Sequence, residues 1–185
     1  ILSFMLLALF LWVARQLVAL TKRNRALRGY RRPKRFDANL LVVGAGSAGL
    51  VSAYIAATVK AKVILVEKAE MGGDCLNTGC VPSKALIRAA KSVVDIERAV
   101  QFGVEAGAPK VDFAAVMGRV HQVIKEIEPH DSVERFTDLG VDCISGEARF
   151  ISPWEVQVNG RIISAEKIIL ATGASPIIPP IPGLA

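Results

Sequence analysis

The stretch from residue 40 to residue 67 constrains the fold more than any other part of the chain. It begins with four consecutive apolar residues, 40–43, and three glycines in G-x-G-x-x-G spacing follow them: Gly44, Gly46 and Gly49. An apolar, helix-compatible segment comes next, and a second apolar run, 63–66, ends in Glu67. Strand, glycine-rich turn, helix and strand in this order predict an α/β fold with a parallel sheet covered on both faces.

Each of the three glycines has its own role in such a turn. Gly44 permits the tight turn, Gly46 lets the backbone approach a pyrophosphate, and Gly49 allows the helix to pack closely on the strand. The phosphates would lie at the helix N-terminus, where free N–H groups and the helix dipole favour anions. Glu67 follows Gly44 by 23 positions, near the spacing of about 20 residues at which a carboxylate binds a ribose hydroxyl. We therefore expect a dinucleotide site, with a plain glycine-rich turn as the alternative.

Two cysteines, Cys75 and Cys80, follow this unit five positions apart. If Cys80 begins the helix predicted over 84–99, about one turn of chain could bring the sulfurs within bonding distance. A helix N-terminus lowers the pKa of a thiol, so we expect a thiolate at Cys80. Such a pair can cycle between dithiol and disulfide, and a static disulfide or two buried thiols are the alternatives. No metal site is expected, because the other candidate ligands have no suitable spacing: His121, His130 and Cys143.

Three motifs, in order, resemble the class I pyridine nucleotide-disulfide oxidoreductases. They are Val42–Gly49, Gly72–Lys84 and Ala171–Pro176. The family includes dihydrolipoamide dehydrogenase, glutathione reductase and mercuric reductase, and the ending ATGASPIIPPIPGL is most similar to the mercuric reductase branch. The resemblance covers residues 37–185 and implies a Rossmann-like FAD-binding domain, of which this chain is the first, incomplete segment.

The resemblance implies a set of FAD-binding residues. The residues implied at the pyrophosphate are Gly44, Gly46, Ser47, Ala48 and Gly49. The residues implied elsewhere along the cofactor are Glu67 at the ribose, Gly73, Lys84 near the flavin ring, Gly146 and Ala148 near the adenine, and Ala171, Thr172 and Gly173 in a turn that closes over it. A cation such as Lys84 would stabilise negative charge on the reduced flavin, and the alternative is an exposed helix lysine.

The resemblance also implies an electron path. Electrons would pass from NAD(P)H to FAD, then to the cysteine pair, and then to a disulfide, a metal ion or a membrane-linked acceptor. Cys75 would be the interchange thiol and Cys80 the charge-transfer thiolate against the flavin. The nicotinamide site, the catalytic histidine and the dimer interface would lie beyond Ala185. We therefore expect a homodimer at full length and an inactive chain on its own.

Two other functions stay open. A membrane-linked flavin quinone dehydrogenase would not need the cysteine pair, and an FAD-binding redox sensor would turn over negligibly. Nothing in the sequence chooses between NADH and NADPH.

The chain departs from the family pattern at two positions. Many members have Thr at the position of Asp74 and Val at the position of Thr78. A carboxylate beside a pyrophosphate would weaken binding unless it is turned away or paired. We therefore expect a different local arrangement around Asp74.

The N-terminal residues predict a membrane helix. Residues 1–20 are almost entirely apolar apart from Ser3, Arg15 and Gln16, and twenty helical residues span about 30 Å, the thickness of the hydrocarbon layer. Arg15 can extend to the headgroups, and no basic segment or cleavage site of a secretory signal is visible. We expect a truncated transmembrane helix over 1–21, a basic linker over 22–36 and the FAD-binding domain over 37–185.

Charge is distributed unevenly along the chain. Nine of the 23 Lys and Arg but none of the 17 Asp and Glu lie in residues 1–36, so the remainder has 14 basic and 17 acidic residues, a net charge of −3. By the positive-inside rule the domain would face the cytoplasm at a bacterial-type inner membrane, with anionic lipid as a partner of the linker. A nucleic-acid patch is the alternative, but Tyr30 is the one aromatic residue interleaved with the arginines, so no nucleic-acid partner is expected.

Further elements are predicted by apolar periodicity. We expect helices over 86–102 and 113–139, the second interrupted near Pro129. We expect strands over 141–144 and 156–163, the latter a hairpin turning at Asn159-Gly160, and a separate buried strand over 167–171.

Overall fold

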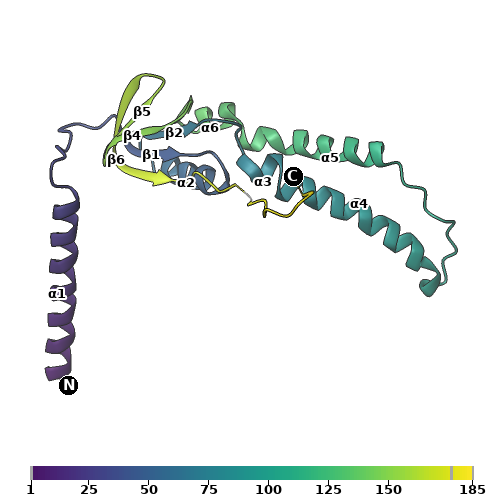
Figure 1. The fold of residues 1–185 in the computed structure, drawn as a ribbon, viewed down its shortest axis with the longest axis horizontal. Helices are drawn as coiled ribbons and strands as arrows, with labels where there is room; N and C mark the ends of the chain where they lie inside the picture. The colour runs from purple at the N-terminus through teal and green to yellow at the C-terminus, as the bar shows by residue number, and fades with distance from the viewer. Residues whose placement is uncertain (1, 176, 185) are drawn as a thin grey trace.

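The computed structural model describes residues 2–175 and 177–184, in which the strands form one six-stranded sheet ordered β3-β2-β1-β6-β5-β4 (Figure 1). The strands are β1 Ala38–Val43, β2 Val63–Glu67, β3 Val141–Ser145, β4 Arg149–Ser152, β5 Glu155–Val158 and β6 Arg161–Leu170. β1, β2, β3 and β6 run parallel, and β5 and β4 add to β6 in antiparallel fashion. The predicted α/β fold is confirmed. Parts of the predicted membrane helix, the third motif and the C-terminal end lie outside the described residues: Ile1, Pro176 and Ala185.

Except for α3, which was not predicted, the helices lie in the segments that the sequence predicts as helical. They are α1 Leu2–Ala26, α2 Ser47–Thr58, α3 Gly73–Asn77, α4 Cys80–Arg98, α5 Phe113–Ile127 and α6 Val133–Asp138, with short 3₁₀ helices η1 Ala99–Phe102 and η2 Glu128–Asp131. The predicted interruption near Pro129 is confirmed, because α5 ends where η2 begins. Pro129 has no N–H to continue an α-helical ladder.

β1 and β2 contribute buried side chains to both faces of the sheet. Leu41, Val43 and Val66 face a core layer completed by side chains of β5 and β6. Val42 and Leu65 point the other way, into a layer closed by α2 and by Phe136 of α6. Alternate residues of β1 therefore belong to opposite layers, as the period of two in a strand requires. This double burial explains why residues 40–43 form an uninterrupted apolar run.

The turn between β1 and α2 depends on close backbone packing. A Cβ atom at Gly49 would lie 1.8 Å from the carbonyl oxygen of Gly44, where no side chain fits. Gly44 has a φ of +103°, which favours glycine. The predicted roles of these two glycines, tight turn and close helix packing, are confirmed.

One predicted strand is wrong as a separate element. Residues 167–170 belong to β6, which runs without a break from Arg161, the residue after the Asn159-Gly160 turn. The turn itself is confirmed, since Val158 pairs with Arg161 across it. The segment is also less buried than predicted, with Leu170 exposed. β6 pairs with β5 along its first half and with β1 along its second half. The periodicity within 167–171 does not reveal this change of partner.

α1 stands apart from the sheet (Figure 1). Its segment Phe4–Ala26 is long and apolar enough to cross a membrane by length and composition, and none of it is buried. The helix extends five residues into the segment expected as linker, ending at Ala26.

The rest of the linker leads to Asp37, whose carboxylate accepts hydrogen bonds of 2.8 Å from both the N–H and the hydroxyl of Ser164 on β6. These hydrogen bonds lower the pKa of Asp37.

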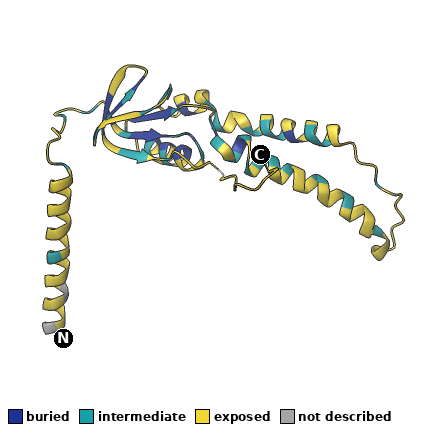
Figure 2. Cartoon of the chain, in the orientation of Figure 1, coloured by how far each residue is buried: buried dark blue, intermediate teal, exposed yellow. Residues whose placement is uncertain are grey.

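α4 and α5 form a hairpin that extends away from the sheet, and it is largely exposed (Figure 2). α4 has no buried residue, and α5 has one described as buried, Val120. The folded core of the described residues is therefore the sheet with α2 and α6.

We expect Gly49→Ala to destabilise the protein by at least about 2–3 kcal/mol, because the added methyl group would overlap the backbone of Gly44. The measurement is urea unfolding followed by circular dichroism. The control is Gly118→Ala in α5, where a Cβ would meet nothing within 4 Å; there the higher helix propensity of alanine should stabilise by about 0.5–1 kcal/mol. Equal stability of the two variants would contradict this account of the turn.

Candidate functional site

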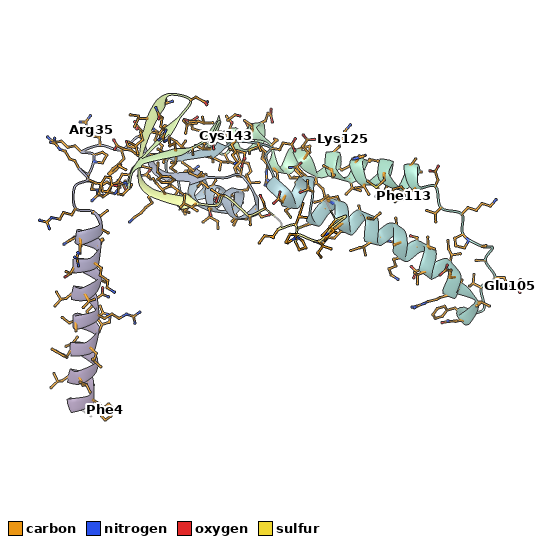
Figure 3. All side chains as sticks on the ribbon, in the orientation of Figure 1. Phe4, Arg35, Glu105, Phe113, Lys125 and Cys143 are labelled. Carbon is orange, nitrogen blue, oxygen red and sulfur yellow. The ribbon has the colours of Figure 1, made fainter. Side chains whose placement is uncertain are left out.

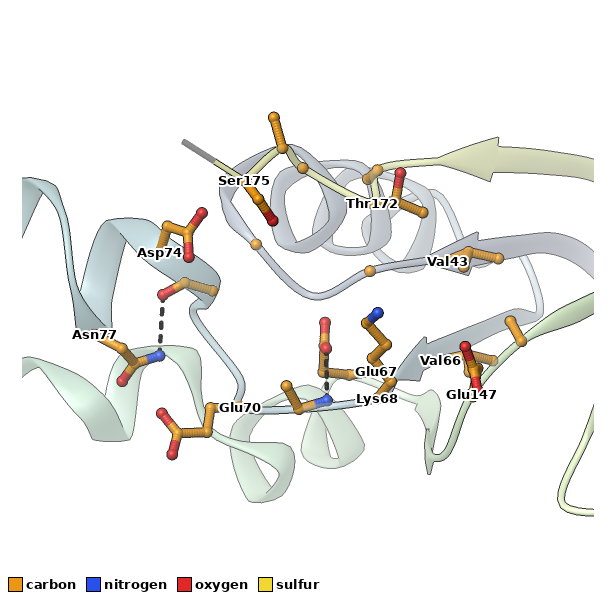
Figure 4. Close-up of a pocket in the computed structure, with 18 of the residues that line it drawn as sticks. Val43, Val66, Glu67, Lys68, Glu70, Asp74, Asn77, Glu147, Thr172 and Ser175 are labelled. Carbon is orange, nitrogen blue, oxygen red and sulfur yellow. Dashed lines mark hydrogen bonds between the residues drawn. The ribbon is translucent and has the colours of Figure 1, made fainter. Parts of the chain in front are cut away.

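A pocket of about 920 Å³ opens at the carboxyl ends of β1, β2 and β6 (Figure 4). The chain continues from β1 to β2 on one side and returns at β6 on the other, so β1 and β6 flank the point where the sheet order reverses. Ligands of open α/β sheets bind outside the carboxyl ends of strands at such a point. The pocket therefore lies where the fold is expected to bind a dinucleotide.

Nine of the implied cofactor-binding residues line this pocket: Gly44, Gly46, Glu67, Gly73, Gly146, Ala148, Ala171, Thr172 and Gly173. Four do not. Ser47 and Ala48 are exposed in the first turn of α2, Gly49 is buried beneath the turn, and Lys84 is exposed on α4.

The backbone around the pocket fits a pyrophosphate. A Cβ on Gly73 would lie 2.8 Å from Cα of Gly46, so two glycine turns approach each other without side chains between them. Gly46 precedes α2 and has no side-chain cap on that helix. The first N–H groups of α2 are thus left for another acceptor, and an anionic group at a helix N-terminus supplies one.

Glu67 lies at the end of β2 with its carboxylate bound to backbone. One oxygen accepts a hydrogen bond from the N–H of Ala45 in the glycine-rich turn, and the other accepts one of 2.8 Å from Ala69. The side chain is thereby fixed between the turn and the loop after β2. Each carboxylate oxygen can accept a second hydrogen bond, so this arrangement is compatible with the predicted contact to a ribose hydroxyl.

The two cysteines meet because the chain turns sharply between α3 and α4. The N–H of Gly79 donates to the carbonyl of Asp74, and a Cβ on Gly79 would lie 2.8 Å from that carbonyl oxygen. α4 begins at Cys80, as predicted, and the thiols of Cys75 and Cys80 lie close enough for each to shift the pKa of the other. Both cysteines are free thiols: the side chain of Cys75 is half-buried and that of Cys80 is exposed. The predicted juxtaposition is confirmed.

The pKa shifts favour the thiolate at Cys75, whereas the sequence predicted it at Cys80. The hydrogen bond from Cys80 lowers the pKa of Cys75, and a hydrogen bond from Ser47 and the charge of Lys84 act in the same direction. The pKa of Cys80 is raised, chiefly by its interaction with Cys75. Lys84 and the backbone at the start of α4 do lower the pKa of Cys80, but their effects are smaller. The prediction from the helix N-terminus alone was wrong because it omitted the neighbouring sulfur.

The two positions that depart from the family pattern contact each other. The hydroxyl of Thr78 lies 3.5 Å from a carboxylate oxygen of Asp74, one turn away, and both residues line the pocket. The charge of Asp74 remains in the pocket, since no ion pair within the described residues involves it. Thr78 therefore orients the carboxylate without neutralising it.

Three residues of the pocket lie outside the predicted strands and motifs. Lys68, Ala69 and Glu70 follow β2 directly, and Figure 4 shows the Lys68 side chain directed into the pocket. Their position at the carboxyl end of a parallel strand is the signal that could have identified them. Four more lining residues lie within or between motif residues, although none was predicted as a site residue: Asn77, Glu147, Ala174 and Ser175.

Comparisons with known proteins agree with this geometry. The chain is 37% identical over 147 residues to the mercuric reductase of Lysinibacillus sphaericus, an alignment that covers 79% of this chain and 27% of that protein. It is 37% identical over 146 residues to the dihydrolipoyl dehydrogenase of Acholeplasma laidlawii, covering 78% of this chain and 43% of that protein. The chain thus spans between about a quarter and under a half of these relatives.

A similar solved structure is the HOCl-induced flavoprotein disulfide reductase RclA from Escherichia coli, with a TM-score of 0.63 and 30% sequence identity. The match covers 78% of this chain and 30% of that one. The family model described as pyridine nucleotide-disulphide oxidoreductase matches residues 38–185, which include all six strands of the described sheet and both cysteines. The chain belongs to the pyridine nucleotide-disulphide oxidoreductase family.

Proposed function

We propose that the full-length protein is an FAD-dependent NAD(P)H oxidoreductase that reduces a disulfide or a metal ion through Cys75 and Cys80. The observation that carries the proposal is the pair of interacting free thiols on α3 and α4 beside a pocket lined by the predicted nucleotide-binding glycines. When bound, FAD would supply the chemistry that takes two electrons from a reduced nicotinamide and delivers them to the cysteine pair. The similarity to a mercuric reductase, a dihydrolipoyl dehydrogenase and a flavoprotein disulfide reductase supports the same reaction class.

The two sulfurs have different parts in the proposed reaction. Cys75 has the lowered pKa and is therefore the better attacking thiolate near neutral pH. With a disulfide acceptor, the Cys75 thiolate attacks one acceptor sulfur, forms a mixed disulfide and releases one thiolate. Cys80 then loses its proton and attacks Cys75, which forms the Cys75–Cys80 disulfide and releases the second thiolate. These roles agree with an interchange function for Cys75.

The remaining parts of the proposed enzyme lie beyond this chain. The length of the relatives supports a nicotinamide site and a dimer interface in further sequence, so we propose a homodimer. Lys84, one turn after Cys80, would place a cation near the flavin ring.

We also propose that α1 anchors the protein in a bacterial-type inner membrane with the nucleotide-binding domain on the cytoplasmic side. The apolar length of α1 and the basic residues at its C-terminal end support this orientation. The reducing cytoplasm would also keep the cysteine pair cycling.

Anaerobic titration of the full-length protein with NADH or NADPH tests the relay. We expect a long-wavelength absorbance band after two electrons per flavin, because a thiolate of the reduced pair then lies against oxidised flavin. Cys75→Ser and Cys80→Ser should each lower acceptor reduction by about a hundredfold or more, while Cys143→Ser on β3 should change little. Direct bleaching of the flavin without that band, with full activity in Cys80→Ser, would instead indicate a quinone dehydrogenase.

The order of thiol ionisation is a second prediction. As the pH rises, Cys75 should react with iodoacetamide at lower pH than Cys80 or Cys143, because its pKa is lowered while the other two are raised. Ser47→Ala should move the Cys75 reaction to higher pH by removing a hydrogen bond to the thiolate. Mass spectrometry of the alkylated peptides measures both effects. Earlier modification of Cys80 would contradict the assignment.

Asp74→Thr is expected to tighten FAD binding by about three- to tenfold, because it removes a negative charge from the proposed pyrophosphate site. Flavin fluorescence of the apoprotein titrated with FAD measures the affinity. Asp95→Asn on α4 removes an equal charge distant from the pocket and serves as the control. Unchanged or weaker binding in Asp74→Thr would mean that the carboxylate does not face the phosphates.

A further inference from the structure

We propose that the basic residues after the apolar part of α1 bind the headgroups of anionic phospholipids and hold the nucleotide-binding domain against the membrane. The proposal rests on the anchoring of α1 in a bilayer proposed above. The basic segment is residues 22–36, which contains no Asp or Glu. Its basic residues are Lys22, Arg23, Arg25, Arg28, Arg31, Arg32, Lys34 and Arg35.

All eight side chains of the basic segment are exposed. Within residues 2–175 and 177–184, ion pairs occur between Lys91 and Asp95 and between Arg119 and Glu126, both away from this segment. Arg32 stacks over the ring of Phe36 at 5.3 Å, which leaves its charge in place. The positive charge is therefore not neutralised by any carboxylate in the described part of the chain.

The structure gathers this charge at one end of the apolar helix. Lys22, Arg23 and Arg25 lie on the last turns of α1, after its apolar residues end at Leu20. The helix closes with a hydrogen bond from Tyr30 to Leu27, and Gly29 takes a φ of +97° there. The remaining basic residues lie in the loop that leads to β1, where Figure 3 labels Arg35.

The loop is long enough either to lie along the bilayer surface or to extend away from it. Residues 27–37 can span at most about 36–40 Å when extended. The attraction of an anionic surface falls off within a Debye length of about 8–10 Å. A loop that lies along the surface keeps its charges within that range, whereas an extended loop does not. Lipid binding would therefore draw the domain toward the membrane.

Charge and chemistry both favour anionic lipid as the partner. The chain beyond residue 36 has a net charge of −3, so the domain itself would be repelled by an anionic surface. Six of the eight basic residues are arginines, whose planar guanidinium groups bind phosphate oxygens in pairs. The basic segment thus provides the attraction that the domain lacks.

Chymotrypsin cleavage after Tyr30 provides the test, because Tyr30 lies in the basic segment and is 52% exposed. The full-length protein is placed in nanodiscs of phosphatidylcholine alone or with about 30% phosphatidylglycerol. We expect cleavage after Tyr30 to be about tenfold slower in the anionic discs, and the difference to vanish in about 0.5 M salt. Cleavage after Phe102, 81% exposed at the tip of the α4–α5 hairpin, is the internal control and should not change.

Two charge variants complete the experiment. In the first, five basic residues of the loop are replaced by glutamine: Arg28, Arg31, Arg32, Lys34 and Arg35. This variant should be cleaved equally fast in both kinds of disc. The matched control replaces five basic residues of the domain: Lys60, Lys62, Lys110, Lys125 and Arg161. It should keep the protection of the unchanged protein. Equal cleavage of the unchanged protein in both discs would overturn the proposal.

Failure of the anchoring and failure of the lipid contact give different results. An anchored protein stays with both kinds of disc in high salt, whatever the headgroup. A protein that stays only with anionic discs, and only in low salt, would contradict the anchoring of α1 but support the lipid contact. Protection of Tyr30 by duplex DNA, with none from anionic lipid, would replace the proposal with a nucleic-acid surface.

Discussion

The carbonyl oxygen of Gly44 lies where a side chain at position 49 would have to go, and the rest of the structure depends on that contact. It allows α2 to pack directly on β1 and β2, burying Leu50 and Ala53 against Val42 and Leu65. The same packing directs the N-terminus of α2 toward the carboxyl ends of the strands. Glu67 then fixes the glycine-rich turn from the opposite side through the N–H of Ala45. One backbone contact thereby sets both the core layer and one wall of the pocket.

The sequence predicted the elements whose signals are local. The apolar run at 40–43, the glycine spacing and the Asn159-Gly160 turn each specify a structure within a few residues, and each was confirmed. β6 was divided wrongly because its two halves pair with different strands, information that only the assembled sheet contains. Lys68 and Glu70 were missed for the same reason, since a loop becomes part of a site only when neighbouring strands end beside it.

The cysteine pair illustrates how far spacing alone can be used. The five-position separation correctly predicted that the sulfurs meet, because Gly79 permits the turn between α3 and α4. Spacing could not predict which sulfur ionises first, since the pKa of each thiol depends on the other thiol and that of Cys75 also depends on Ser47, from another part of the sequence. The same holds for Asp74 and Thr78, two departures from the family pattern that proved to be neighbours.

The hydrogen bonds between Asp37 and Ser164 have a mechanical consequence. Any force that α1 exerts on the domain reaches the sheet at Asp37, the residue before β1. Because that residue is bonded through both backbone and side chain to the middle of β6, the load is shared by two adjacent parallel strands. Shear along paired strands must break several hydrogen bonds together, whereas a strand pulled from its end would separate one bond at a time. The linker thus joins the domain at a point where several hydrogen bonds must break together. Both strands that bear the force lead to the pocket.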